Sequence, residues 1–249
     1  TADFSMRIFN ADGSEAQMCG NAIRCVGKYL NDRGITDKTV LDIQTLSGVR
    51  RLHLHKGPDG LVQSATVGMG RARIVQPYLQ LELSGAVVNG IVVDVGNPHF
   101  VVFCPDADAV DIERLGPAIE RHPLFPDRIN VEFVSVLPAD AIPSAASSTL
   151  TPGVLPSDAE DPSLREMAPS GGKSPSALRM RVWERGSGIT LACGTGACAS
   201  VAAARASGVV GSPCTVLTDG GPLQISCSID GTLLMKGPAR TVFDGTLEI

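Results

Sequence analysis

Apolar and polar residues alternate along several short stretches of this 249-residue chain, a pattern typical of half-buried β-strands. Helical spacing of apolar residues predicts three helices instead. One begins at Cys19 and ends near Gly34, one covers residues 110–122 before two prolines, and one of small residues follows Cys193. The predicted strands cover residues 4–9, 39–44, 49–55, 61–67, 91–95, 99–103, 129–134, 179–186, 215–218, 222–229, 232–236 and 241–249.

The pattern is lost in one long stretch in the second half of the chain. Between Leu137 and Ala177, proline, serine, alanine and glycine dominate and no periodicity survives. We therefore expect a disordered surface insertion at residues 138–177 that carries little of the fold.

Composition and charge narrow the class of protein. The chain is 43% hydrophobic and 19% charged, which is typical of a globular protein, and its net charge is −5 with no long basic run. These features argue against nucleic acid or an anionic membrane as a partner. No apolar run approaches the ~20 residues of a membrane span, and the chain does not start with a signal-peptide pattern. Seven unevenly spaced cysteines argue against a secreted disulfide scaffold, so we expect a cytoplasmic protein.

One cysteine stands where a strand gives way to a helix. Cys193 is followed by Gly194, Thr195 and Gly196, and the glycines allow a sharp turn with uncovered backbone N–H groups. The positive end of a helix favours a thiolate over a thiol, so this cysteine is a candidate proton acceptor or nucleophile. Taken alone, the motif is more typical of a buried structural cysteine beside a tight turn.

A second copy of the motif favours the chemical interpretation. Cys19, Gly20 and Asn21 again follow an apolar approach and open a helix that contains a further cysteine. The shared order of features suggests two related lobes, each presenting one thiol at a helix start.

Two such thiols suit the removal of an α-proton from an amino acid. One takes the proton as thiolate while the other delivers a proton to the opposite face of the carbon. The alternative route through pyridoxal phosphate needs a lysine for a Schiff base, and none of the five lysines lies in a specific context. The cysteine spacings also do not fit a zinc site, so we expect no cofactor and no metal.

The chain resembles the diaminopimelate epimerase family, whose members need no cofactor and serve lysine and peptidoglycan-precursor biosynthesis. The resemblance covers nearly the whole chain in family order. Its segments are Arg7-Ile8-Phe9-Asn10-Ala11-Asp12-Gly13-Ser14-Glu15, Met18-Cys19-Gly20-Asn21, Gly96-Asn97-Pro98-His99, Asn130-Val131-Glu132-Phe133, Trp183-Glu184-Arg185-Gly186 and Ala192-Cys193-Gly194-Thr195-Gly196-Ala197-Cys198.

The resemblance implies an α/β (α+β) fold of two pseudo-symmetric lobes, each a curved, mostly antiparallel sheet around a central helix. Residues 1–70 with 238–249 would form the first lobe and residues 71–237 the second. It also implies a homodimer that epimerises LL-diaminopimelate to the meso form. Cys19 and Cys193 would be the acid–base pair. Substrate-binding residues would be Asn10, Gly20, Asn21, Asn97, Asn130, Glu184, Arg185, Gly194 and Thr195, with His99 assisting.

Two departures from the family pattern leave alternatives open. The family's first segment, with its His-Gly-x-Gly-Asn-Asp-Phe motif, is absent, and the chain starts with Thr1, so we expect a truncated first lobe. The insertion at 138–177 replaces a short link. A proline or hydroxyproline racemase would share the thiol pair but carries Cys-Gly-His where this chain has Asn21. A truncated, non-catalytic member of the fold is the other alternative. On spacing alone, His99 also fits a satisfied core histidine.

Overall fold

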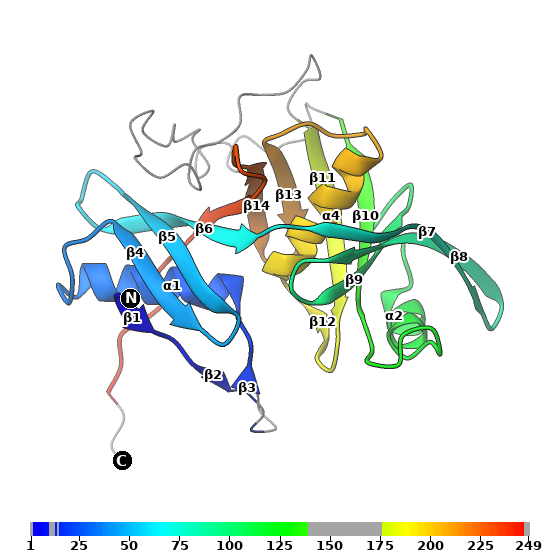
Figure 1. Ribbon diagram of the computed structural model, residues 1–249, viewed down its shortest axis with the longest axis horizontal. Helices are drawn as coiled ribbons and strands as arrows, with labels where there is room; N and C mark the ends of the chain where they lie inside the picture. Colours follow the sequence, from blue (N-terminus) through cyan, green and yellow to red (C-terminus); the bar gives the residue numbers. More distant parts are fainter. Residues whose placement is uncertain (1, 10–12, 14, 139–175, 247–249) are drawn as a thin grey trace. The chain divides into compact units, whose positions relative to one another are not determined.

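The chain forms a mixed α/β structure with extended sheet and few helices (Figure 1). The structure, a computed structural model, describes residues 2–9, 13, 15–138 and 176–246. It divides into two compact units: unit 1 comprises Thr1–Val67 and Lys236–Ile249, and unit 2 comprises Gly68–Met235. The chain passes between the units within strands β6 (Val62–Gly70) and β15 (Leu233–Pro238).

Unit 1 is a small sheet with one helix against it. Helix α1 (Gly20–Asp32) packs on β5 (Gly48–Lys56), and a Cβ at Gly27 would lie 2.8 Å from the Leu54 side chain, so the close approach requires glycine. The predicted strand 4–9 is interrupted, because its first part pairs with β4 (Val40–Thr45) and its second part with β3 (Glu15–Ala16). The elements of this sheet, in spatial order, are β1 (Phe4–Ser5), β4 (Val40–Thr45), β5 (Gly48–Lys56) and β6, with β2 (Ile8–Phe9) and β3 (Glu15–Ala16) forming a separate ribbon.

Unit 2 holds a larger sheet that is mostly antiparallel. Two of its pairs are parallel: β9 (Pro98–Phe103) with β10 (Asn130–Leu137), and β11 (Ser176–Glu184) with β13 (Cys214–Thr218). Helix α2 (Ile112–Glu120) provides the crossover that the first of these pairs needs. The strands, in spatial order, are β14 (Gly221–Cys227), β13 (Cys214–Thr218), β11 (Ser176–Glu184), β10 (Asn130–Leu137), β9 (Pro98–Phe103), β8 (Ala86–Asp94) and β7 (Arg73–Leu83), with β12 (Gly188–Thr190) paired to β11.

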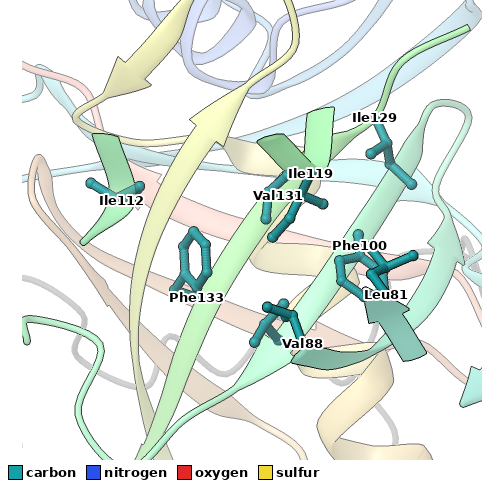
Figure 2. Close-up of a cluster of buried hydrophobic side chains, with 9 residues drawn as sticks. Leu81, Val88, Phe100, Ile112, Ile119, Ile129, Val131 and Phe133 are labelled. Atoms are coloured by element: carbon teal, nitrogen blue, oxygen red, sulfur yellow. The ribbon is translucent and has the colours of Figure 1, made fainter. Parts of the chain in front are cut away.

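Successive side chains of β10 point to opposite faces of the unit 2 sheet, and the two faces differ in character. Val131 and Phe133 join Phe100 and the apolar side of α2 in a buried hydrophobic cluster (Figure 2). Asn130 and Glu132, which alternate with them along the strand, must point to the opposite face. That face carries helix α4 (Gly194–Ala206), which packs on β8 to β11.

Helix α4 is buried along most of its length, as expected for a central helix. Its alanines, glycines and serine let the helix backbone approach the sheet closely, and Ser200 lies with its hydroxyl 3.4 Å from the Met180 sulfur. The small-residue helix predicted after Cys193 is therefore confirmed, as is the helix predicted at 110–122.

Several predictions from the pattern were wrong or fall outside the described residues. The long β7–β8 hairpin was missed over residues 73–90, because its polar residues hide the alternation. The strand predicted at 241–249 is absent over residues 241–246. Of the insertion expected at 138–177, residues 139–175 lie outside the described part of the chain, and Ser176 and Ala177 begin β11. No helix in the described ranges has the length and apolar character to cross a bilayer.

Candidate functional site

The first candidate thiol caps the start of α1. Cys19 has an extended backbone (φ −133°, ψ 113°), and its Sγ accepts a hydrogen bond from the backbone N–H of Ala22 at 3.5 Å. The side chain is half-buried. A cysteine thus occupies the position usually held by Ser, Thr, Asp or Asn, and the sulfur takes up one of the free N–H groups at the helix start.

A buried arginine stands behind this turn. Arg24 donates from Nη1 to the backbone oxygen of Gly20 at 3.1 Å and to Oδ1 of Asn21 at 3.2 Å, and from Nε to Pro238 O at 3.3 Å. Burial lowers the pKa of the Arg24 guanidinium, and the nearby thiols of Cys25 and Cys19 oppose that effect. Sequence reasoning missed this residue, although an arginine on the buried side of a helix was the available signal.

The second candidate thiol repeats the geometry in unit 2. Cys193 caps α4 with φ −119° and ψ 115°, and its Sγ accepts from the backbone N–H of Gly196 at 3.4 Å. The Thr195 hydroxyl lies 3.4 Å from the same sulfur. Unlike Cys19, this cysteine is buried, with 6% of its surface exposed.

Three neighbouring strands place polar side chains on the face that carries α4. In the parallel register of β9 and β10, His99 pairs with Asn130. In the antiparallel register of β10 and β11, Glu132 pairs with Val182, so Glu184 shares their face. The strands and α4 therefore gather the polar residues that the sequence scattered over almost a hundred positions.

A continuous chain of hydrogen bonds links Glu132 and His99 to Cys193. His99 Nδ1 lies 2.7 Å from Glu132 Oε1, and His99 Nε2 lies 3.1 Å from Asn97 Oδ1. Asn97 Nδ2 donates to the Thr195 hydroxyl at 3.3 Å, and that hydroxyl reaches Cys193. Sequence reasoning gave Glu132 no role, although a carboxylate inside an apolar strand is a recognisable signal.

The protonation of Cys193 is governed by its surroundings more than by the helix start. Burial, and after it the charges of Glu184 and Glu132, raise the pKa of the Cys193 thiol well above its ordinary value. The hydrogen bonds from Thr195 and Gly196 act in the opposite direction without overcoming them. The helix start favours the thiolate, as predicted, but burial and the two glutamates outweigh it, so the expectation that Cys193 is a thiolate is wrong.

The turn after β11 presents Glu184 and Arg185. Asn130 holds it, donating to Pro98 O at 3.0 Å and accepting from the Arg185 backbone N–H at 2.9 Å. Glu184 accepts from the Thr190 hydroxyl at 2.5 Å, and the largely exposed Arg185 guanidinium donates to Asp127 O at 3.0 Å.

Glu120 on α2 supports the same turn from behind. Its carboxylate accepts from Trp183 Nε1 at 2.8 Å and from the Gly186 backbone N–H at 2.9 Å. The side chain is almost fully buried.

The predicted site residues divide between the two units. Cys19, Gly20 and Asn21 lie at the start of α1 in unit 1, and Asn10 lies outside the described residues. Unit 2 brings together Asn97, His99, Asn130, Glu184, Arg185, Cys193, Gly194 and Thr195. His99 is fully buried and has a partner on each ring nitrogen. Over residues 2–9, 13, 15–138 and 176–246, no three His, Cys, Asp or Glu side chains gather closely enough to hold a metal ion.

Comparisons with known proteins show which family the sequence matches. A family model described as "Diaminopimelate epimerase" matches residues 1–75, 91–146 and 168–242. A diaminopimelate epimerase from Phocaeicola vulgatus is 44% identical over 260 residues, covering all of this chain and 80% of its own length. One from Parabacteroides distasonis is 42% identical over 249 residues, with 100% and 79% covered.

Solved structures with low sequence identity share the fold. A hydroxyproline epimerase from Agrobacterium vitis matches with a TM-score of 0.63 at 16% identity, over 94% of this chain and 67% of that one. A probable proline racemase from Agrobacterium radiobacter matches with a TM-score of 0.64 at 16% identity, over 96% and 72%. At such identities the likeness establishes architecture alone.

Proposed function

Because this chain belongs to the diaminopimelate epimerase family, we propose that it is an isomerase that converts LL-2,6-diaminopimelate to meso-diaminopimelate, with Cys19 and Cys193 as its acid and base. The reaction serves lysine and peptidoglycan-precursor biosynthesis. The proposal needs no electron-sink cofactor, because two thiols suffice to move a proton from one face of the α-carbon to the other.

The observation that carries the proposal is the repeated cysteine cap. Two helices of 13 residues each begin with a cysteine of nearly the same backbone angles. In both, the sulfur accepts the N–H three residues ahead. The remaining N–H groups at each helix start suit a carboxylate and the negative charge that develops on it when the α-proton leaves.

The proton balance assigns starting roles. Since its pKa is raised, Cys193 is a thiol at neutral pH and starts as the proton donor. Cys19 then takes the α-proton as thiolate, and the electron pair left on carbon receives the proton of Cys193 from the other face. The products are the inverted carbon, a Cys19 thiol and a Cys193 thiolate, which is the starting state for the reverse direction.

The proposed contacts fall into two groups, one for each end of the substrate. Gly20, Asn21, Gly194 and Thr195 would bind the reacting carboxylate at the two helix starts. The distal end of the substrate, with an amine and a carboxylate, would be held by the Glu184–Arg185 turn. Asn10, Asn97 and Asn130 complete the proposed set.

Proline or hydroxyproline racemisation is the rival function. The structural neighbours named for those reactions share only the fold with this chain, at 16% identity. The relatives above 40% identity are diaminopimelate epimerases, and Asn21 stands where the rival motif has histidine. A homodimer and a cytoplasmic location are further parts of the proposal, which gel filtration and cell fractionation test.

The deciding experiment follows the α-proton in heavy water. Wild-type protein, Cys19→Ser and Cys193→Ser are incubated with LL-diaminopimelate, and α-deuteration and the meso isomer are measured by NMR and chiral chromatography. We expect the wild type to produce deuterated meso product and both variants to lose epimerisation. Cys25→Ser, which alters an exposed cysteine on α1, is the matched control and keeps activity.

Turnover in either single-thiol variant refutes the two-cysteine mechanism. L-Proline and trans-4-hydroxy-L-proline are tested alongside, and racemisation of either in place of diaminopimelate would favour the rival. Binding of diaminopimelate without turnover by the wild type would instead support the non-catalytic alternative.

A further inference from the structure

Glu132 is a buried carboxyl group that the proposed mechanism does not use. Neither its side chain nor that of His99 has any exposed surface, and the two are joined at 2.7 Å. Its second oxygen, Oε2, has no hydrogen-bond partner among the described residues. A carboxyl group enclosed in this way is costly unless it holds a proton or faces a cation, so its presence calls for a reason other than packing.

The neighbouring bonds determine where protons lie. Asn97 uses Nδ2 to donate to Thr195, so its Oδ1 is left to accept from His99, which requires a hydrogen on His99 Nε2. If His99 is neutral, its Nδ1 is then a lone pair that needs a proton from Glu132. If His99 is charged, its Nδ1–H donates to the Glu132 carboxylate. In both cases the pair holds one shared proton, and burial, which raises the pKa of Glu132, acts in the same direction.

The same reasoning fixes the last bond of the chain. The Thr195 hydroxyl accepts from Asn97, so its own hydrogen is left for the Cys193 sulfur at 3.4 Å. With the Gly196 N–H, this gives the sulfur two donors. Three ionisable groups influence the Cys193 thiol: Glu132 from β10, Glu184 from β11 and, through its bond to Glu132, His99 from β9. The first turn of α4 contributes no acidic residue.

Glu132 also lies directly against the capped turn. A Cβ at Gly196 would be 2.6 Å from Glu132 Oε1 and 3.2 Å from the Cys193 Cβ. The Glu132 carboxyl group and the Cys193 side chain therefore both lie against Gly196, in the first turn of α4.

We propose that Glu132 is a positioning residue for Cys193: by sharing a proton with His99 it sets the direction of the hydrogen-bond chain that ends with Thr195 donating to the sulfur. Without that proton, His99 can place its single hydrogen on Nδ1. The Asn97 amide then turns over to donate to Nε2, and the Thr195 hydroxyl turns toward Asn97 and away from Cys193. The inference rests on the proposed function, because a thiolate at Cys193 needs this donor when it forms.

The first test compares two isosteric changes at buried carboxyl groups of unit 2. Glu132→Gln keeps the size of the side chain and removes the shared proton. Glu120→Gln is the matched control, since Glu120 is also almost fully buried but bonds Trp183 and Gly186 and lies 3.6 Å from the Arg128 guanidinium. We expect kcat of Glu132→Gln to fall about 10- to 100-fold with KM little changed, the size of effect seen for groups that orient catalytic residues. For Glu120→Gln we expect KM to rise, because the Glu184–Arg185 turn loses its support. An unchanged kcat in Glu132→Gln overturns the inference.

The second test reads the proton on His99 directly and does not depend on turnover. In ¹⁵N-histidine-labelled protein, we expect His99 Nε2 to carry a hydrogen in the wild type and in Glu120→Gln. In Glu132→Gln we expect a mixture with hydrogen on Nδ1.

A wild-type His99 without a hydrogen on Nε2 overturns the inference, even if Glu132→Gln does not fold. A fall in kcat with an unchanged His99 spectrum also overturns it, since that result indicates a merely structural role. Failure of the wild type to epimerise diaminopimelate refutes the proposed function instead, and the NMR result still stands as the test of the shared proton.

Discussion

The starts of α1 and α4 share a backbone motif and differ in nearly everything around it. Both place a cysteine sulfur within 3.5 Å of a backbone N–H. Cys19 is half-buried beside the guanidinium of Arg24, whereas Cys193 is buried beside two carboxyl groups. The helix supplies the same donors in both places, so at Cys193 it is the loss of water and the surrounding charges that set the pKa of the thiol.

This contrast matches the chemistry proposed for the pair. An epimerase of this kind needs one proton donor and one acceptor at the start of each turnover, which two identical thiols in identical surroundings would not provide. Burial, and after it the carboxylates of Glu184 and Glu132, raise the pKa of Cys193 and hold its proton. The surroundings of Cys193 therefore fit the donor role proposed for it.

The largest expected effect comes from making α4 resemble α1. Gly196 occupies the third position after Cys193, where α1 has Ala22 after Cys19. In Gly196→Ala the new Cβ would approach Glu132 Oε1 to 2.6 Å, and Glu132 is enclosed and cannot move aside. We expect kcat to fall about 10²-fold through misplacement of Cys193 and Glu132. Unfolding stability should drop by about 1–3 kcal/mol.

The reciprocal change is the control. Ala22→Gly keeps the N–H that reaches Cys19 and adds no atom, so it should cost about 0.5–1 kcal/mol of stability and leave kcat within a small factor of wild type. Steady-state kinetics and urea unfolding measure both variants. Equal kcat in the two would show that Glu132 is not held as firmly as its burial indicates.

The sequence predicts features that depend on neighbouring residues better than features that depend on residues far apart in the chain. The cysteine caps were predicted correctly, because a glycine-rich turn before a helix is a local pattern. The carboxyl group of Glu132 beside Cys193 was not, because its place depends on strand register. Glu132 meets His99 only through the parallel pairing of β9 and β10, which are separated by α2. Local pattern likewise missed the β7–β8 hairpin, whose exposed polar side chains conceal its strands.

A smaller effect is expected from the charges around Cys193. Glu184→Gln removes a carboxylate that raises the pKa of Cys193, so the thiolate should form at lower pH. Thr195→Val removes a hydrogen bond that lowers the same pKa, so the thiolate should form at higher pH. Iodoacetamide alkylation of Cys193 across pH, quantified by peptide mass spectrometry, measures both shifts.

The buried Cys198, whose pKa is raised by burial alone, is the internal reference for these measurements. Its alkylation should be the same in both variants. Shifts of the same sign in Glu184→Gln and Thr195→Val would mean that altered access to the sulfur, and not charge, controls the reaction.

The smallest effect concerns the second cysteine of each helix. Burial raises the pKa of Cys198 from 9.0 to about 12, whereas Cys25 on α1 is exposed. Between pH 9 and 12 the unfolded chain releases the Cys198 proton and the folded chain retains it, so unfolding becomes easier as pH rises. Below pH 9 both states hold the proton and this contribution to stability is complete. On moving from pH 8 to pH 10, Cys198→Ala should therefore lose about 1 kcal/mol less stability than the wild type. Urea unfolding at the two pH values measures the difference, and an equal loss in both proteins would mean that water reaches Cys198 before the fold opens.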